Sequence, residues 1–598
     1  MSFLIRELYS RCLTPFLQSS KISQNLFRKY SLPRLILNMN EAVFRYDEGS
    51  DKFEVMLRYV NTDLNVDRQF NFNRNVNEPI NHFLRRLESN IQSLTIKKLK
   101  RKNKGKSINT DTMDNLLNNV ENKRIKFVKD NSILDGNLTC KAILEDLSNV
   151  KLIIFDTEYK LIQNTPIVTN IKLPLCILVG FLTYPSKFVT MHVDKTISAF
   201  DWYKMETNKW IHVGEGYFYI PTASDVGCKL KLKCVPRKGD QTGPAIEIIS
   251  NGKVEAGPGV CPFEIRHCFT KTKLSGKSFR VTSYNILANV YSLTDVSKDV
   301  LYPYCPEYAL SMDYRKLLIL KELRGYNADI ICLQEVENKV FENDLLPALS
   351  ILNYSGICNL KNDLQEGLAV FYNQDRFDQL NCSYSILSQG TDLSEFNITW
   401  LQIENENVKQ AFLNRNTVIQ AIALRSKENS EILVVGNTHL FFRSDADHIR
   451  LLQAYYGLMY LQKFSREIKK ENLECNVSIV YCGDFNSAPY NGIYQLMTQK
   501  YIPEDYADWK SSPNEHIKNV TLQHNISFSS ACGTPEYTNY TANFSGCLDY
   551  IFYQNDYLEV EQVIPMPSKE ELSLHTGLPS VVFPSDHISL CADLKWLK

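Results

Sequence analysis

The residues best suited to catalysis lie in the second half of the 598-residue chain, where apolar segments repeatedly end in polar side chains. These segments are FRVTSYN with Asn285, ADIICLQEVE with Glu335, EILVVGNTH with His439, VSIVYCGDFNS with Asp484 and Asn486, GCLDYIFY with Asp549, and PSDHISL with His587. Catalytic groups are commonly carried at the strand ends and loops of a rigid sheet. The pattern therefore predicts one shared site, in which carboxylates bind a metal ion and imidazoles act on charge or protons.

Each of these residues is weak evidence alone, because a single Asp or Asn at a strand end is more often a turn former or a helix cap. The set is more informative. It combines carboxylates, amides and imidazoles without a cysteine zinc motif or a glycine-rich phosphate loop. Hard oxygen ligands without thiolates favour Mg²⁺, with Mn²⁺ as a substitute, over zinc.

The motifs SYNILAN, LQEVE, NTHL, GDFNSAP, LDYIF and SDH, in this order, resemble the endonuclease/exonuclease/phosphatase superfamily and its carbon-catabolite-repressor-like deadenylase branch. Within that branch, YPYCPEYAL, SACGTPEYTNY and EVEQVIPMPS are similar to the mitochondrial 2′,5′-phosphodiesterases. The resemblance covers residues 279–598. It implies a Mg²⁺-dependent 3′-end exoribonuclease that hydrolyses 2′,5′-oligoadenylate and 3′,5′ poly(A) and releases AMP. The implied fold is α/β, a four-layer α/β/β/α sandwich.

The resemblance also implies a role for each motif residue. Glu335, Asn285 and Asp484 would bind the metal, and Asp484 would orient or deprotonate the attacking water. Asn486 would position water and phosphate, and His439 would donate to the phosphoryl oxygens. His587, oriented by Asp549, would complete the site. Whether His587 or Asp484 takes the proton is left open.

Substrate selectivity is expected to depend on aromatic stacking. Phe544 matches the position where these deadenylases place a ring against adenine, and the alternative is that Phe544 is a core residue. After His439 the chain reads Leu-Phe-Phe-Arg-Ser, so Ser444 stands where the family usually has proline. The resemblance therefore predicts only half of the family's adenine-stacking wall.

The first 35 residues contain six Arg or Lys and one acid, Glu7, with Leu, Ile and Phe interspersed. This composition is typical of a mitochondrial transit peptide, which predicts cleavage after Tyr30 and a location in the mitochondrial matrix. The alternative is an ordinary surface helix.

Residues 41–269 predict an N-terminal, mostly β, sandwich-like domain. It includes a hairpin over 41–69, a helix near 79–99 and a basic, mobile insertion near 97–131. Trp202, Trp210, Tyr217 and Tyr219 are interpreted as core aromatics rather than a ligand-stacking surface. A polar linker over 270–277 separates this domain from a catalytic domain over 278–598.

Composition excludes several classes of protein. The formal net charge is +0, so any polyanion site must come from local clustering. No apolar run approaches the ~18 residues that a membrane span needs. The 16 cysteines are scattered and predict reduced thiols. No obligate protein partner is evident. A small-molecule phosphatase of the same superfamily and an inactive RNA-binding scaffold remain as alternatives to the RNA-cleaving enzyme.

Overall fold

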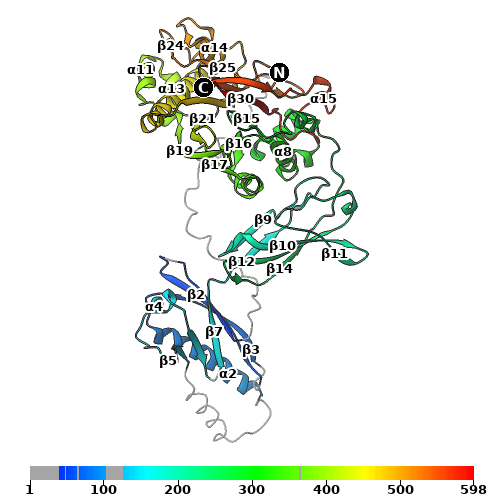
Figure 1. Cartoon of the computed structure of the whole chain (residues 1–598), viewed down its shortest axis with the longest axis vertical. Coiled ribbons are helices and arrows are strands. Elements are labelled where there is room, and N and C mark those ends of the chain that lie inside the picture. The colour runs from blue at the N-terminus through cyan, green and yellow to red at the C-terminus, as the bar shows by residue number, and fades with distance from the viewer. Residues whose placement is uncertain are drawn as a thin grey trace.

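The computed structural model describes residues 40–47, 49–62, 66–102, 125–155, 157–361 and 365–597, with the side chains of 99–102 left aside. The predicted transit peptide at 1–30 lies outside these ranges. Three parts follow one another along the long axis of the molecule: a sheet with one long helix, a smaller β unit and a large C-terminal sandwich (Figure 1). Among the helices in the described ranges, none combines the length and apolar composition that crossing a bilayer requires.

The first part is a seven-stranded sheet covered by the helix α2 (Ile80–Lys102). Its strands, in spatial order, are β3 (Val66–Asn75), β2 (Lys52–Asn61), β1 (Glu41–Arg45), β7 (Thr157–Gln163), β6 (Val150–Ile154), β4 (Lys126–Lys129) and β5 (Ser132–Ile133). Phenylalanines from the strands and from α2 form its core. The predicted hairpin is confirmed, since β1 and β2 pair antiparallel. The helix α2 continues to Lys102 and β4 begins at Lys126, so both ends of the predicted insertion near 97–131 belong to regular elements. For 103–124, outside the described residues, the insertion stays a prediction.

The second part has a separate hydrophobic core. A sheet of β11 (Lys209–Glu215), β10 (Asp194–Glu206), β12 (Leu230–Lys238), β13 (Gln241–Thr242) and β14 (Ile246–Ile249) accompanies a ribbon of β8 (Ile167–Lys172) and β9 (Lys187–Met191). Trp202 lies in this core, and Tyr217 and Tyr219 pack against it. For these three residues the interpretation as core aromatics is confirmed. Trp210 is not among the residues of this core and lies half-buried on β11, with Lys231 Nζ 5.1 Å from its ring centroid. The predicted β-rich N-terminal region is also confirmed, with its strands divided between two cores.

The third part consists of two six-stranded sheets packed face to face. The first contains β17 (Tyr354–Leu360), β18 (Glu366–Asn373), β16 (Ile330–Glu337), β15 (Ser278–Asn285), β30 (Leu590–Trp596) and β29 (Leu558–Val563). The second contains β19 (Phe377–Ile386), β20 (Val418–Ser426), β21 (Ile432–His439), β22 (Val477–Asp484), β28 (Asp549–Gln554) and β25 (Phe528–Ser530). Near-continuous apolar runs in the central strands fit burial on both faces.

Helices cover the outer faces of both sheets. Tyr284 and Ile331 of the first sheet pack against Ile319 and Leu323 of α8 (Met312–Tyr326). The helix α13 (Asp447–Glu471) covers the second sheet in the same way. The four-layer α/β/β/α sandwich is thereby confirmed. The shorter helices are α4 (Cys140–Glu145), α5 (Pro262–Arg266), α6 (Asn289–Ser292), α7 (Glu307–Leu310), α9 (Asn338–Val340), α10 (Leu346–Ser350), α11 (Ser394–Gln402), α12 (Glu406–Leu413), α14 (Gly492–Gln499) and α15 (Lys569–Ser573).

The segment that enters the sandwich is tied to it by a buried arginine. Arg266, at the end of α5, donates to the Tyr326 hydroxyl at 2.6 Å and to the Ser589 carbonyl at 2.8 Å. Its guanidinium also lies 3.8 Å from the fully buried Glu322 carboxylate. Residues upstream of the predicted 270–277 linker therefore contribute to packing behind the strand that follows His587.

Candidate active site

Strand register brings the predicted residues of the second sheet into one row. In the parallel pair β21 and β22, His439 lies opposite Asp484. In the antiparallel pair β22 and β28, Asp484 lies opposite Asp549. Each residue ends or begins its strand, so three polar side chains occupy the same edge of the sheet. The chain leaves regular structure at this edge, which frees the side chains from the apolar core between the sheets.

Asn285 connects this row to the first sheet. Its Nδ2 donates to Glu335 Oε1 at 3.1 Å and to Asp484 Oδ2 at 3.0 Å. Its Oδ1 accepts from the Leu287 amide at 3.1 Å. In this geometry the amide nitrogen of Asn285 faces the two carboxylates and holds them in place, and its amide oxygen accepts from the backbone.

Glu335 presents its carboxylate from a distorted position in β16. Its φ is 57°, and the pairing with β18 shifts register between Gln334 and Val336, so the strand bulges there. The Ala288 amide donates to Oε2 at 2.8 Å. Burial raises the pKa of Glu335 to about 7, and the nearby Glu366 and Asp586 carboxylates add to this rise. A bound cation would relieve this concentration of negative charge, so the donor set fits a hard divalent metal.

Asp484 is the most densely contacted carboxylate of the site. Its Oδ1 accepts from the Asn486 amide at 2.9 Å. Its Oδ2 lies 3.6 Å from His439 Nε2 and 3.5 Å from His587 Nε2. Burial raises the pKa of Asp484 to about 6, Asp549 raises it further, and His587 opposes the rise. A carboxylate with a pKa near neutrality suits proton transfer at physiological pH.

His587 is held between two carboxylates. Its Nδ1 lies 2.8 Å from Asp549 Oδ2, which also accepts from the Thr538 hydroxyl at 2.6 Å. Burial disfavours the charged ring, but Asp549 and Asp484 outweigh burial and keep the pKa of His587 well above its ordinary value. Ligand atoms of Asp484, Asp549 and His587 lie within 4.8 Å of one another. Because the Nδ1 proton is directed at Asp549, we interpret the three as an ion-pair network.

His439 has the opposite protonation behaviour. Burial lowers the pKa of His439 well below its ordinary value, and the charges of Lys361 and His587 lower it further. Lys361 Nζ lies 3.1 Å from His439 Nδ1 and 2.9 Å from Glu366 Oε1. The site therefore contains one cationic imidazole, His587, and one neutral imidazole, His439.

Several supporting residues were missed at the level of sequence: Lys361, Glu366, Thr538, Ser585 and Arg315. Ser585 donates to the Asn285 carbonyl at 2.7 Å and caps the His587 amide at 3.2 Å. Its position in the PSDH motif was an available signal. The others carry no local signal, because charged and hydroxyl residues at strand ends and in helices are usually solvated or capping groups.

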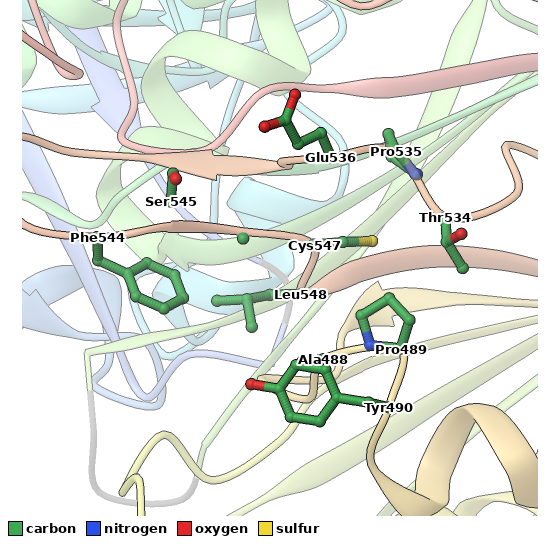
Figure 2. Close-up of a pocket in the computed structure, with 11 residues that line it drawn as sticks. Ala488, Pro489, Tyr490, Thr534, Pro535, Glu536, Phe544, Ser545, Cys547 and Leu548 are labelled. Atoms are coloured by element: carbon green, nitrogen blue, oxygen red, sulfur yellow. The ribbon is translucent and has the colours of Figure 1, made fainter.

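The predicted substrate residues lie beside the same strand ends. Asn486, with φ 50°, donates from Nδ2 to the Leu440 carbonyl at 3.0 Å. Phe544 is 39% exposed and lines a cleft, so the alternative of a core residue is wrong (Figure 2). Ser444 is exposed on its loop. The carbonyls of this loop accept from Arg450, including that of Phe441 at 3.0 Å and that of Ser444 at 3.4 Å.

Comparisons with known proteins identify relatives along most of the chain. Residues 165–255 match the 2′,5′-phosphodiesterase 12-like N-terminal domain. The chain is 40% identical over 488 residues to 2′,5′-phosphodiesterase 12 of Rattus norvegicus, covering 76% of this chain and 79% of that protein. It is 39% identical over 487 residues to the Homo sapiens protein of the same name, with the same coverage.

More distant relatives match the C-terminal part. The CCR4-Not complex 3′-5′-exoribonuclease subunit Ccr4 of Schizosaccharomyces pombe is 29% identical over 346 residues, covering 53% of this chain and 49% of that protein. The solved structure of ANGEL2, a 2′,3′-cyclic phosphatase, in complex with adenosine-2′,3′-vanadate is 23% identical with a TM-score of 0.45, covering 54% of this chain and 97% of that one. Residues 282–587 match the family described as endonuclease/exonuclease/phosphatase. The chain belongs to this endonuclease/exonuclease/phosphatase family of hydrolases.

Proposed function

We propose that the chain is a Mg²⁺-dependent 3′-end exoribonuclease of the mitochondrial matrix that hydrolyses 2′,5′-linked oligoadenylate and 3′,5′-linked poly(A), releasing AMP. The observation that carries the proposal is the surrounding of Asp484. Its Oδ2 is 3.0 Å from Asn285 Nδ2 and within 3.6 Å of two imidazole nitrogens. The names of the relatives, a 2′,5′-phosphodiesterase and a 3′-5′-exoribonuclease, support the substrate class.

Glu335 and Asp484 are proposed to hold the metal, with Asn285 fixing the distance between their carboxylates. When bound, Mg²⁺ or a substituting Mn²⁺ would neutralise phosphate charge and polarise the phosphoryl oxygens. Oxygen donors without a thiolate in contact support this choice of ion over zinc.

Side chains of the protein are proposed to fill the remaining catalytic roles. Asp484 is proposed to orient and deprotonate the attacking water, because Asp549 and Asp484 raise the pKa of His587 well above its ordinary value and so favour a charged ring that is a poor base. The imidazolium of His587 and the neutral Nε2–H of His439 are placed to donate to charge that develops on the phosphoryl oxygens. Asn486 is proposed to position the phosphate. Charge-directed donors of this kind act mainly on the transition state.

The decisive test is hydrolysis of matched 2′,5′- and 3′,5′-linked adenylate trimers, with uridylate trimers for comparison, in Mg²⁺ and in EDTA. We expect chelator-sensitive release of AMP from both adenylates and little product from uridylate. A Glu335→Ala protein provides the background rate. Failure to cleave any oligonucleotide would reject the exoribonuclease, and turnover of small phosphorylated metabolites would then favour a phosphatase of the same family.

The mitochondrial location is proposed from the basic, acid-poor composition of the first 30 residues. Import of the full chain into isolated mitochondria, compared with a chain lacking residues 1–30, tests it. We expect only the full chain to become protease-protected and shortened. Equal protection of both chains, or of neither, contradicts the proposed transit peptide.

A further inference from the structure

A cleft of about 340 Å³ opens directly beyond the strand ends that carry Asp484 and Asp549. Three segments line it: 488–490, 534–536 and 544–548 (Figure 2). Since β22 and β28 are antiparallel with Asp484 opposite Asp549, the residues after Asp484 and those before Asp549 leave the sheet at the same edge. The Phe485 amide donates to the Leu548 carbonyl at 2.9 Å and holds these two segments together. The cleft is therefore an extension of the candidate active site.

Its size and lining suit one nucleobase. Small-molecule pockets measure ~300–1,000 Å³, so this cleft lies at the lower end of that range. Of the described residues that line the cleft, Glu536 alone is charged, and its carboxylate pairs with Lys569. None of these lining residues offers a cationic side chain to bind a phosphate. An uncharged, planar group fits this lining better than an anion.

Two aromatic residues enter the cleft from different segments. Phe544 precedes Asp549, and Tyr490 follows Asn486 (Figure 2). Figure 2 shows Leu548 between the two side chains. Tyr490 is 87% exposed, while Phe544 is 39% exposed. Aromatic rings stack on the face of any base, and such stacking is a common way of holding single-stranded RNA.

Tyr490 contributes little to the packing of the protein. Within the described ranges it has no hydrogen bond, ion pair or ring contact, and most of its surface faces solvent. Pro489 fixes its own φ in the segment that leads to Tyr490. Contact with a ligand therefore accounts for this large aromatic side chain, on a loop beside a proposed catalytic residue, better than a role in folding does.

The loop after His439 is a poorer source of a second stacking surface. Ser444 offers no ring, and the ring of Phe441 has the guanidinium of Arg415 above it at 4.2 Å from the centroid. A second guanidinium, that of Arg443, lies 5.9 Å from the same centroid. The face of Phe441 is thus used within the protein, whereas the face of Tyr490 is open.

We infer that Tyr490 is a specificity-determining residue that stacks on the base of the 3′-terminal nucleotide in the cleft shared with Phe544. This inference rests on the proposed function, because it takes a nucleotide as the substrate. The base is held by its ring face, and the adjoining 5′-phosphate reaches Asp484 and Asn486.

The test uses the full chain as wild type, Tyr490→Ala and Tyr490→Phe. Tyr384→Ala is the matched control, because Tyr384 is 54% exposed on β19 and is not part of the cleft. Dissociation constants for AMP and for ribose 5-phosphate are measured by calorimetry, with kcat/KM for the adenylate trimer. We expect Tyr490→Ala to weaken AMP binding about 5- to 150-fold, as loss of one stacked ring does, with ribose 5-phosphate unchanged. Tyr490→Phe and Tyr384→Ala should match wild type.

Equal effects on AMP and ribose 5-phosphate, no effect on either, or no AMP binding by wild type would overturn the inference. Cleavage of adenylate that does not depend on Tyr490 keeps the proposed function and rejects the stacking role. Conversely, Tyr490-dependent AMP binding without cleavage of any oligonucleotide keeps the stacking role and rejects the exoribonuclease. The proposed function and the stacking role of Tyr490 can therefore be rejected independently of each other.

Discussion

Lys361 Nζ lies 3.1 Å from His439 Nδ1, and this contact determines which nitrogen of the imidazole carries the proton. An ammonium group has three donors and no acceptor, so Nδ1 must accept. In the neutral ring the proton is then on Nε2, the nitrogen that faces Asp484 Oδ2 at 3.6 Å. Glu366 holds Lys361 in place at 2.9 Å. The chain Glu366–Lys361–His439 thus presents a hydrogen-bond donor to the site.

Replacing Lys361 with Met should reduce turnover about 10- to 100-fold, a typical cost of losing a group that orients a functional histidine. The effect should fall on kcat more than on KM, because the Nε2–H donor is proposed to act on developing charge. Nitrogen NMR of the histidine rings provides a second measurement. We expect the His439 tautomer to change in Lys361→Met and to persist in Lys595→Met, an exposed control at the far end of β30. An unchanged tautomer would contradict the assignment.

Glu335→Ala and Asp484→Ala should each lower turnover about 100-fold or more while the protein stays folded, because both carboxylates are proposed to act on the charged transition state. Removing either also relieves repulsion between buried carboxylates, so unfolding should not become easier in metal-free buffer. The measurements are single-turnover hydrolysis and thermal unfolding followed by circular dichroism. Near-normal turnover in a folded variant would remove that residue from the mechanism.

Metal binding should stabilise the protein more at pH 8 than at pH 5. Burial raises the pKa of Glu335 to about 7 and that of Asp484 to about 6. Both pKa values are higher in the folded state than in the unfolded state. The metal-free native state therefore binds more protons than the unfolded chain, and the stability of the protein falls as the pH rises from about 4 through about 7. The raised pKa of His587 has the same effect. The stability that His587 contributes is fully present below its pKa in the unfolded state and is lost as the pH rises through its pKa in the folded state.

Thermal shift measurements with Mg²⁺ and with EDTA at both pH values check this linkage. The Mg²⁺-dependent rise in Tm should be larger at pH 8, where Glu335 and Asp484 are ionised beside other buried carboxylates without a cation. Glu335→Gln should remove most of that difference. A Mg²⁺ response that is equal at the two pH values, or unchanged in Glu335→Gln, would place the metal elsewhere.

Arg315 should be essential for the stability of the loops that carry the site. This fully buried arginine donates to the carbonyls of Ile286 at 3.0 Å, Leu287 at 2.8 Å and Pro584 at 3.1 Å. Arg315→Met would leave several buried carbonyls without a donor, each costing about 1–3 kcal/mol. We expect the free energy of unfolding of the sandwich to fall by about 3 kcal/mol or more.

Urea unfolding followed by tryptophan fluorescence measures this loss, because Trp509 and Trp596 are buried in the sandwich and report on it. Arg466→Met is the control, since its side chain on α13 is half-exposed and a surface substitution should stay within about 0.5 kcal/mol. A similar midpoint for Arg315→Met and Arg466→Met would show that the loops hold their shape without the guanidinium.

The sequence by itself determined the family, the order of the motifs and the polar residues that end the central strands. Asn285, His439 and Asp484 could be placed at strand ends because a buried strand is a continuous apolar run, and its end is a local property of the chain. The helical spacing of apolar residues predicted the outer helix over Met312–Tyr326 for the same reason.

Only the tertiary structure decided how these residues are charged and supported. Lys361 and His439 are 78 residues apart in the chain, and Ser585 and Asn285 are 300 apart. The opposite protonation of His439 and His587 depends on such neighbours and on burial, neither of which has a local signature. The openness of Tyr490 is also a property of the assembled cleft. Local patterns identify elements and their ends, whereas electrostatics and pocket shape depend on distances between segments that only folding brings together.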